Sequence, residues 1–194
     1  MLKRGFDLAM AGVSLIILSP LLVIVAVLIK IDSPGAVFFR GQRVGKDGRP
    51  FHIFKFRTML QNAAQIGPGI TSAGDPRITR VGRWLRRTKI DELPQLWNVV
   101  RGEMSLVGPR PEDPRYVALY TDEQRRVLGV RPGITSPASI QFRHEEAILP
   151  AGDMDIYIKD LMPAKIEADL KYLDRQTFGS DLVLLFRTAL ALFR

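Results

Sequence analysis

The strongest constraint on this chain is an uncharged apolar run, LAMAGVSLIILSPLLVIVAVLI, at residues 8–29. A helix of that length measures about 33 Å at roughly 1.5 Å per residue, close to the ~30 Å hydrocarbon thickness of a bilayer. A buried core helix is disfavoured because the run has no polar face. A cleaved signal peptide is also disfavoured, because the run is long and no small-residue cleavage site follows it. The run therefore predicts a helix embedded in a membrane.

Two features favour a helix that enters the membrane and returns on the same side. Ser19-Pro20 lies near the middle of the run, and proline lacks the N–H that a helix interior needs, so a break is expected there. Both flanks are basic, which favours the cytoplasmic side for both ends. The sequence thus predicts a re-entrant membrane helix over residues 1–31 and a domain at the cytoplasmic face over residues 32–194. A kinked spanning helix is the alternative.

The rest of the chain predicts an α+β fold that is mostly helical. Residues 32–59 hold a short apolar run, a turn at Lys46-Asp47-Gly48 and an alternating aromatic segment, a pattern typical of a small β-hairpin. Residues 61–76 are rich in glycine and proline and predict a loop. Residues 78–89 and 181–194 have helical periodicity with one apolar face. We expect these two amphipathic helices either to lie at the membrane interface or to dock on the core.

Charge and composition limit the possible partners and chemistry. The chain has 28 Lys and Arg against 20 Asp and Glu, a net charge of +8, which favours an anionic partner such as nucleic acid, a phosphorylated substrate or acidic lipid. The absence of cysteine excludes disulfides, a thiol nucleophile and Cys-ligated metals. Two histidines are too few for a His-built metal centre, and we expect His144 and the acid-rich segment 144–155 to be solvated. Walker, GxGxxG, HExxH and GxSxG motifs are absent.

Candidate chemistry is densest in TKIDELPQLWNVVRGEMSLVGPRPED, residues 88–113. Asp91-Glu92 precedes Leu93-Pro94, so the ordinary interpretation is that Asp91 caps a helix and Pro94 occupies its first turn. Two adjacent carboxylates can also hold Mg²⁺ together with substrate phosphates, and a carboxylate in such a site can act as a nucleophile. The sequence leaves both interpretations open.

Several basic residues are candidates for binding phosphate. Arg110 stands between two prolines that restrict its backbone, and its planar guanidinium matches phosphate oxygens, although a structural salt bridge is equally compatible. Lys55 and Arg57 alternate on one face of a predicted strand, where they are either solvated or cradle a phosphate. Arg131 precedes Pro-Gly and Arg143 follows a phenylalanine, and neither setting decides between binding and solvation.

Two blocks of sequence are highly specific: DELPQLWNV at residues 91–99 and GEMSLVGPRP at residues 102–111. Shorter pieces accompany them in order: Lys3-Arg4 with Asp7, Ser19-Pro20, Phe38-Phe39, KFRTM at 55–59, DPRIT at 75–79 and RPGIT at 131–135. With these pieces the chain resembles, nearly end to end, the monotopic phosphoglycosyl transferases of the bacterial sugar transferase family, in the small form that consists of the catalytic domain alone.

The resemblance implies an enzyme that transfers a phosphosugar from a nucleotide diphosphate sugar to polyprenol phosphate, with release of nucleoside monophosphate. The implied donor is a UDP-sugar and the implied acceptor is undecaprenyl phosphate. Such a reaction starts the assembly of a glycoconjugate: an exopolysaccharide, an O-antigen or a glycoprotein glycan. The family also implies a location at the cytoplasmic face of the bacterial inner membrane, with Ser19-Pro20 as the break of the re-entrant helix and residues 32–194 as the catalytic domain.

Roles for individual residues also follow from the resemblance. It places the nucleophile at Asp91, which would carry a covalent phosphosugar between the two steps of a ping-pong reaction. It places Glu92 near a required Mg²⁺, so both carboxylates are expected to be catalytic residues and metal ligands. It assigns phosphate or substrate binding to the basic residues Lys55, Arg57, Arg110, Arg131 and Arg143.

The match weakens after Thr135. The family usually reads Gly-Trp-Ala-Gln-Val and then Gly-Arg, whereas this chain reads Ser136-Pro137-Ala138-Ser139-Ile140. Arg143 stands where the arginine of the family would fall. The altered loop leaves open which sugar or nucleotide is recognised there.

Two other functions compete with the transferase. A non-catalytic, membrane-anchored basic module that binds anionic lipid would gain nothing from Asp91-Glu92 among its arginines. A polyprenol diphosphate phosphatase would use the lipid but would need no sugar nucleotide. Nucleic acid is a poor fit as a partner, because the basic residues share the chain with a membrane segment. The sequence leaves the sugar, the pathway and the oligomeric state, a homo-oligomer included, open.

Overall fold

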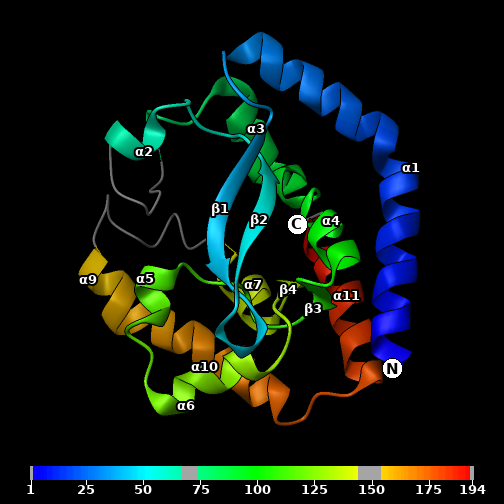
Figure 1. Cartoon of the computed structure of the whole chain (residues 1–194), viewed down its shortest axis with the longest axis vertical. Coiled ribbons are helices and arrows are strands. Elements are labelled where there is room, and N and C mark those ends of the chain that lie inside the picture. Colours follow the sequence, from blue (N-terminus) through cyan, green and yellow to red (C-terminus); the bar gives the residue numbers. More distant parts are fainter. Residues whose placement is uncertain (1, 67–73, 144–153, 193–194) are drawn as a thin grey trace.

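A long N-terminal helix lies along one side of a body of shorter helices and small sheets in the computed structural model, which describes residues 2–66, 74–143 and 154–192 (Figure 1). The first half of the chain forms α1 (Leu2–Asp32), β1 (Phe38–Val44), η1 (Lys46–Gly48), β2 (Pro50–Phe56), α2 (Ala63–Ile66), α3 (Arg80–Thr88), η2 (Ile90–Glu92), α4 (Gln95–Arg101) and β3 (Ser105–Val107). The second half forms α5 (Pro114–Val117), α6 (Asp122–Arg125), η3 (Arg126–Gly129), β4 (Gly133–Thr135), α7 (Pro137–Gln141), α9 (Met154–Ile156), η4 (Tyr157–Leu161), α10 (Met162–Leu173) and α11 (Phe178–Leu192).

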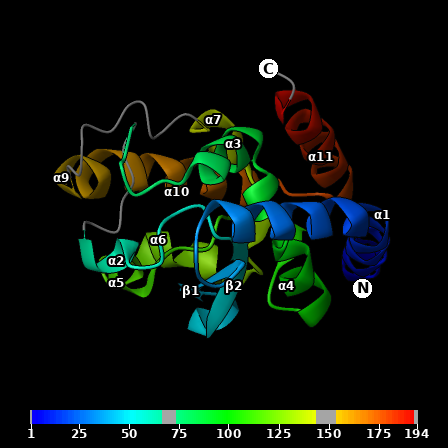
Figure 2. The ribbon, with the colours of Figure 1, turned by 90° about the horizontal axis from the view of Figure 1, so that it is seen from above.

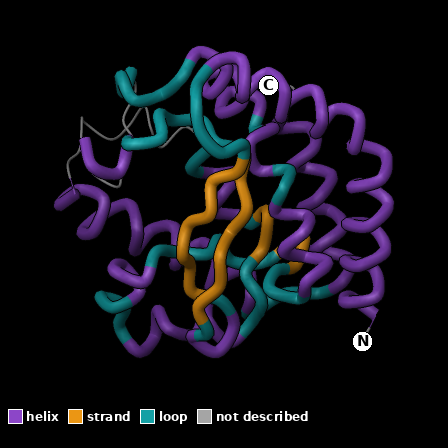
Figure 3. Tube along the Cα trace, turned by 45° about the horizontal axis from the view of Figure 1, so that its top comes forward, coloured by secondary structure: helices purple, strands orange, loops and turns teal. Residues whose placement is uncertain are grey.

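Helices dominate the described residues, as predicted, and the hairpin has the predicted place (Figure 3). Strands β1 and β2 pair antiparallel, from Phe38 opposite Phe56 to Val44 opposite Pro50. The turn between them needs positive φ at Asp47 (57°) and Gly48 (75°), which is why Asp-Gly suits it. The segment 61–76, predicted as a loop, contains the short helix α2, and its residues 67–73 lie outside the described residues.

Helix α4 packs against β2 through a shared apolar cluster and through one fully buried polar side chain, Asn98. The Asn98 Oδ1 accepts from the Phe54 N–H at 2.9 Å, and its Nδ2 donates to the His52 carbonyl at 2.8 Å and to Glu103 Oε2 at 2.7 Å. The amide therefore acts like the peptide group of a third strand. It holds α4, and the turn that precedes it, against the hairpin.

A second, parallel two-stranded sheet joins two of the sequence motifs, and the sequence did not predict it. Beside the β3–β4 pairing, the Gly133 N–H donates to the Pro109 carbonyl at 2.8 Å and the Gly108 N–H to the Thr135 carbonyl at 3.0 Å. A Cβ on Gly133 would lie 2.1 Å from the Gly108 nitrogen, so only glycine permits this approach. The two glycines bring the GPRP and RPGIT motifs into direct contact.

Helix α1 bends around Ser19-Pro20 but stays one continuous helix, and its two halves run in different directions in Figures 1 and 2. Proline has no N–H to give to the carbonyl four residues earlier, which is that of Ile16. The Ser19 hydroxyl donates to this same Ile16 carbonyl at 2.8 Å. The break predicted from the sequence is therefore a bend in which the serine replaces the missing proline donor.

The two sides of α1 differ sharply in burial. Its inner side packs on the body with Ala11 in the first half and Val25 and Ile29 in the second, all nearly or fully buried. Its outer side exposes large apolar residues, with Ile16 at 75% and Ile31 at 77% exposure. Among the described helices, α1 alone is long and apolar enough to cross a membrane by length and composition.

The first turns of α1 are fastened to the body by polar side chains. Lys3 pairs with the buried Asp181 of α11 at 2.6 Å, and Arg4 donates to a carbonyl near the end of α4 at 2.8 Å. Asp7 is buried and accepts from the Ser105 hydroxyl at 2.7 Å. Lys3 and Arg4, which form the basic flank before the apolar run, thus also hold α1 to the body. Helix α1 packs along the domain that follows it.

Both predicted amphipathic helices form and dock on the body with one face. Helix α3 starts at Arg80, inside the predicted range 78–89, because Asp32 and the N-cap residue Thr79 accept from N–H groups of its first turn at 3.1 and 3.0 Å. Its Leu85 is fully buried, whereas Trp84 is 46% exposed. Helix α11 likewise exposes Phe186 while its opposite face joins the core.

Replacing Asn98 by alanine should lower the free energy of unfolding by about 2–4 kcal/mol, because backbone groups that lose a hydrogen-bond partner in the interior cost about 1–3 kcal/mol each. The groups affected are the His52 carbonyl and the Phe54 N–H, whereas the Glu103 carboxylate keeps its ion pair with Arg101. The thermal midpoint in detergent measures the effect, and the exposed Asn62→Ala is the matched control. Equal midpoints for the two variants would contradict the docking role.

Candidate active site

The adjacent carboxylates Asp91 and Glu92 lie on the short 3₁₀ turn η2, between α3 and α4. Lys89 ends α3 in the left-handed conformation (φ 58°), which turns the chain into η2. Helix α4 starts only at Gln95, and its N-cap position is Pro94, without a side-chain cap. The interpretation of Asp91 as a helix cap is therefore wrong, because a separate turn stands between it and the helix.

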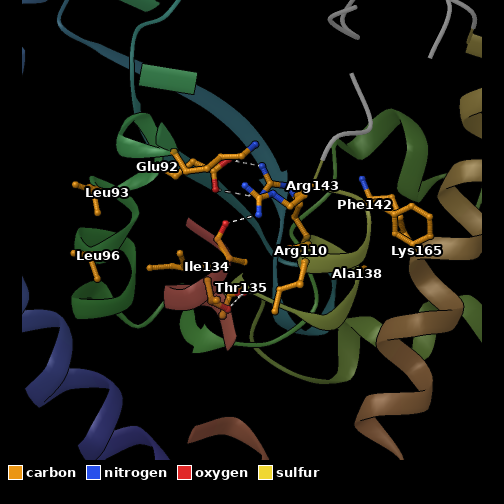
Figure 4. Close-up of a pocket in the computed structure, with 15 residues that line it drawn as sticks. Glu92, Leu93, Leu96, Arg110, Ile134, Thr135, Ala138, Phe142, Arg143 and Lys165 are labelled. Carbon is orange, nitrogen blue, oxygen red and sulfur yellow. Dashed lines mark hydrogen bonds and ion pairs between the residues drawn. The ribbon is translucent and has the colours of Figure 1, made fainter. Parts of the chain in front are cut away.

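Glu92 is the centre of an ion network that links three segments. Lys55 Nζ of β2 lies 2.8 Å from Glu92 Oε1, and Arg110, which follows β3, places Nη2 at 2.6 Å from Oε1 and Nη1 at 3.2 Å from Oε2 (Figure 4). Burial alone would raise the pKa of Glu92, but Arg110 and Lys55 hold it well below its usual range. Burial and the charge of Arg110 lower the pKa of Lys55. Glu92 is thus a fully compensated anion.

Asp91 has the opposite environment. Its side chain is buried, and among the described residues Oδ1 has no hydrogen-bond partner. Burial raises the pKa of Asp91 to about 6, against the nearby charge of Lys55. One turn further on, the buried Gln95 also leaves its Nε2 without a partner among the described residues. The two neighbouring carboxylates therefore differ: Glu92 is paired with two cations, whereas Oδ1 of Asp91 lacks a hydrogen-bond partner among the described residues.

A cavity of about 200 Å³ opens beside this pair. Its lining residues come from α4, β4, α7, α10 and α11 as well as from η2 (Figure 4): Lys89, Glu92, Leu93, Leu96, Arg110, Ile134, Thr135, Ala138, Ser139, Ile140, Phe142, Arg143, Lys165, Thr188 and Ala191. Asp91 is not itself one of the lining residues, although the next residue, Glu92, and Lys89, two residues earlier, are. The cavity combines an apolar wall with four cations, which suits a ligand that carries both phosphate and apolar groups.

Three of the five basic residues expected to bind substrate are gathered here. Lys55 and Arg110 meet at Glu92, and Arg143 lines the cavity with Arg110. Arg110 forms a salt bridge, with Glu92, as the alternative interpretation of its sequence setting predicted. Arg143 is anchored by a hydrogen bond to the carbonyl of Ala191 in α11.

The other two predicted residues lie elsewhere. The buried Arg57 donates to the carbonyls of Pro34 and of Ser33, the latter at 2.8 Å, so it ties down the segment after α1. The alternation that grouped it with Lys55 does not apply, because β2 ends at Phe56. Arg131 donates to a carbonyl at 2.9 Å and lines a different cavity, of about 290 Å³. Neither position supports a role beside the carboxylates.

Sequence reasoning missed the cavity residues that come from the last two helices. Lys165 of α10 and Thr188 of α11 reach the cavity, and the Thr188 hydroxyl lies 2.8 Å from that of Thr135. No local pattern marks Lys165, since only the packing of α10 against α7 brings it there. His144 and most of the acid-rich segment, residues 144–153, lie outside the described residues.

The chain is similar to known proteins over almost its whole length. The model of the family described as "Bacterial sugar transferase" matches residues 1–194. The chain is 41% identical over 192 residues to the UDP-N-acetylgalactosamine-undecaprenyl-phosphate N-acetylgalactosaminephosphotransferase of Aeromonas hydrophila, covering 96% of this chain and 42% of the relative. It is 36% identical over 197 residues to the UDP-glucose:undecaprenyl-phosphate glucose-1-phosphate transferase of Escherichia coli K12, covering 97% and 39%.

The chain thus spans less than half the length of those two relatives. It matches shorter proteins almost completely: it is 38% identical over 197 residues to the exopolysaccharide production protein PSS of Rhizobium leguminosarum bv. phaseoli, covering 98% of this chain and 94% of the relative. With a family model that matches every residue and relatives aligned over nearly its whole length, this chain belongs to the bacterial sugar transferase family.

Proposed function

We propose that this chain transfers a phosphosugar from a UDP-sugar to undecaprenyl phosphate, releases UMP and so begins the assembly of a polysaccharide. The names of the relatives support both substrates, since they couple UDP-sugars with undecaprenyl phosphate. The observation that carries the chemistry is the buried, unsatisfied Oδ1 of Asp91 beside the fully compensated Glu92. A lipid-binding module without catalysis has no use for a buried, unpaired anion next to its cations.

Asp91 is the nucleophile in this proposal. A carboxylate oxygen of Asp91 attacks the phosphorus that bears the sugar, and the bond from this phosphorus to the bridging oxygen of the diphosphate breaks. UMP leaves with the electron pair, and the phosphosugar remains on Asp91 as an acyl phosphate. A phosphate oxygen of the lipid then attacks the same phosphorus, which releases the polyprenol diphosphate sugar and restores the carboxylate. Two chemical steps on one residue imply ping-pong kinetics.

The cations of the site reduce the repulsion between a carboxylate and a diphosphate. Glu92 orients Arg110 and Lys55 through contacts of 2.6 and 2.8 Å. Because both are held by a buried partner, they need no rearrangement when charge develops on the phosphoryl oxygens. Arg143 and Lys165, which also line the cavity, extend its positive charge to the second phosphate or to the acceptor.

The acidic pair also fits Mg²⁺. Among the described residues no group of three or more His, Cys, Asp and Glu converges as a metal site. Mg²⁺ needs only one or two carboxylates when substrate phosphates and water complete its shell, and the unpartnered Asp91 Oδ1 is such a ligand atom. We infer that Asp91 would hold the ion, which would supply neutralisation of the diphosphate charge. Glu92, the second expected ligand, would first have to release Arg110 or Lys55, because both of its oxygens are paired.

We further propose that α1 enters the inner membrane from the cytoplasmic face, bends at Ser19-Pro20 and returns to the same face. The exposed apolar side of α1, together with the exposed Trp84 of α3 and Phe186 of α11, supports a molecule that sits on the membrane rather than in solution. The Ser19 hydroxyl donates to the Ile16 carbonyl, which Pro20 leaves without its helical donor. This hydrogen bond favours the bend in lipid, where an unpaired carbonyl is costly. No nucleic acid is involved in this proposal.

The function is tested with a panel of sugar nucleotides in the presence of undecaprenyl phosphate and Mg²⁺, with UMP as the measured product. We expect release that depends on the lipid and is restricted to one or a few sugars. Release of inorganic phosphate from polyprenol diphosphate without a sugar nucleotide would instead support the phosphatase.

Asp91→Asn should abolish UMP release, because the asparagine amide has the shape of the carboxylate but is a poor nucleophile. In the absence of lipid, the unmodified enzyme should release at most about one equivalent of UMP per enzyme, and this burst should vanish in the variant. The thermal midpoint should not fall, since no hydrogen bond to Oδ1 is lost. The exposed Asp122→Asn is the control. Near-normal turnover of Asp91→Asn would exclude the covalent route.

Arg110→Lys should lower turnover by about 100-fold, the usual cost of one preorganised donor, with little change in the thermal midpoint. Lysine keeps the charge but loses the planar fork that arginine gives to phosphate. Arg101→Lys is the matched control, since Arg101 makes an exposed 3.4 Å ion pair with Glu103 away from the cavity. A midpoint that falls in step with activity would support a purely structural salt bridge.

The topology is tested by single cysteines, because the chain has none of its own. Leu2→Cys and Ala36→Cys sit at exposed positions on either side of the apolar run. Gly35 is avoided because its φ of 116° disfavours a side chain. We expect an impermeant thiol reagent to label both from the cytoplasmic side, as it should the surface control Glu123→Cys. Labelling of position 2 only from the periplasmic side would establish a spanning helix.

A further inference from the structure

A buried amide close to Asp91 has no part in the reaction described above. The side chain of Gln95 is only 1% exposed, and among the described residues its Nε2 has no hydrogen-bond partner. Burying an amide without a partner is costly, and nearly all buried polar groups in folded proteins are paired. An unpaired buried donor therefore points to a partner that enters the site, either a ligand or water.

Gln95 and Asp91 lie on one face of a continuous right-handed helical backbone. The 3₁₀ turn η2 ends at Glu92, and the next two residues, Leu93 (φ −56°, ψ −34°) and Pro94 (φ −60°, ψ −15°), keep helical dihedral angles until α4 begins at Gln95. Residues four apart on such a backbone are neighbours on the same face, with Cβ atoms about 5–6 Å apart. Asp91 and Gln95 are such a pair.

The polar ends of these two side chains complement each other but do not meet. Oδ1 of Asp91 is an acceptor, Nε2 of Gln95 is a donor, and both atoms are buried. A hydrogen bond between them would satisfy both, yet neither atom has a partner among the described residues. A third group that binds to the carboxylate and accepts from the amide would complete the arrangement.

The face that carries this pair is turned toward β2. Asn98, one turn after Gln95 on the same face, bonds to the backbone of β2, and η2 and α4 both contact this strand. Lys55 belongs to β2, and its charge favours the ionised form of Asp91 by lowering the pKa of that carboxyl. A phosphoryl group bound to Asp91 would thus have an uncharged donor near it as well as a cation.

We propose that Gln95 is a catalytic residue of the transferase, whose Nε2 donates a hydrogen bond to a phosphoryl oxygen of the phosphosugar while Asp91 carries it. This proposal rests on the proposed function. Phosphoryl transfer spreads negative charge over the three equatorial oxygens, and a donor that is already in place stabilises this charge without reorganisation. An unpaired amide is the expected state of such a donor in the free enzyme, because its partner arrives only with the substrate.

Gln95→Met tests the donor, because methionine has a similar length and no N–H. We expect kcat and the rate of the UMP burst to fall about 100-fold, the usual cost of one preorganised donor, with a smaller effect on KM for the sugar nucleotide. The thermal midpoint should stay the same or rise, because an apolar side chain replaces an unpaired buried amide. A glutamine with a merely structural role would not give this combination.

Gln95→Glu separates the donor of the amide from its acceptor. Glutamate keeps the shape and Oε1 but has a second acceptor in place of Nε2, so the loss of turnover should be at least as large as in Gln95→Met. Gln42→Met is the matched control, since Gln42 is exposed on β1. We expect this control to change neither turnover nor the thermal midpoint.

A near-normal burst in Gln95→Met, or near-normal turnover in Gln95→Glu, would overturn the proposal. So would a Gln95→Met protein that fails to fold or whose activity falls in step with its thermal midpoint, because the amide would then be part of the fold, held by water or by protein. Failure of the function itself has a different signature: the unaltered protein would then release no UMP with any sugar nucleotide.

Discussion

The buried carboxylate of Glu92, shared by Lys55 and Arg110, is the interaction on which the site depends. It joins β2, η2 and the segment after β3, which are separate in sequence. Burying such ions is costly unless the geometry satisfies them closely, so the backbone must deliver all three groups accurately. Asn98 fixes β2 relative to α4 by its hydrogen bonds to the backbone of β2. The close contact of Gly108 with Gly133 fixes the segment that carries Arg110.

The parts that could be predicted from the sequence are those whose cause is local. The hairpin follows from a turn that needs positive φ at Asp47 and Gly48, and α3 follows from its periodicity and from the cap at Thr79. The pairing of β3 with β4 could not be predicted, because strands of three residues show no periodicity and their partners lie far apart in the chain.

The same distinction applies to the site. Asp91-Glu92 and Arg110 stand out through unusual local sequence, and the structure gathers them. Arg57 does not share a strand face with Lys55, because β2 ends at Phe56, and its guanidinium donates to the Ser33 carbonyl. Lys165 carries no signal, since an isolated lysine in a helical stretch is normally solvated. It reaches the cavity only because α10 packs against α7.

Helix α1 shows how one set of residues can meet two demands. The exposed apolar side suits lipid, yet the inner side is fitted to the body over both halves, and Lys3 and Asp7 fasten its start. A helix held at its start and packed beyond its bend has little freedom to straighten. The bend is therefore set by the body as well as by Pro20, and the Ser19 hydroxyl removes its cost by pairing the carbonyl that proline leaves free.

The neighbouring carboxylates gain their different roles from this same frame. Glu92 faces two cations and stays ionised, whereas Asp91, one residue earlier, is buried without a partner for Oδ1 among the described residues. If Lys55 and Arg110 were free to pair with Asp91, its carboxylate would be neutralised in an ion pair. Glu92 prevents this by holding both cations at hydrogen-bonding distance. In the proposed reaction, the paired acid thus leaves the cations in place for the phosphate while Oδ1 of Asp91 stays unpaired among the described residues.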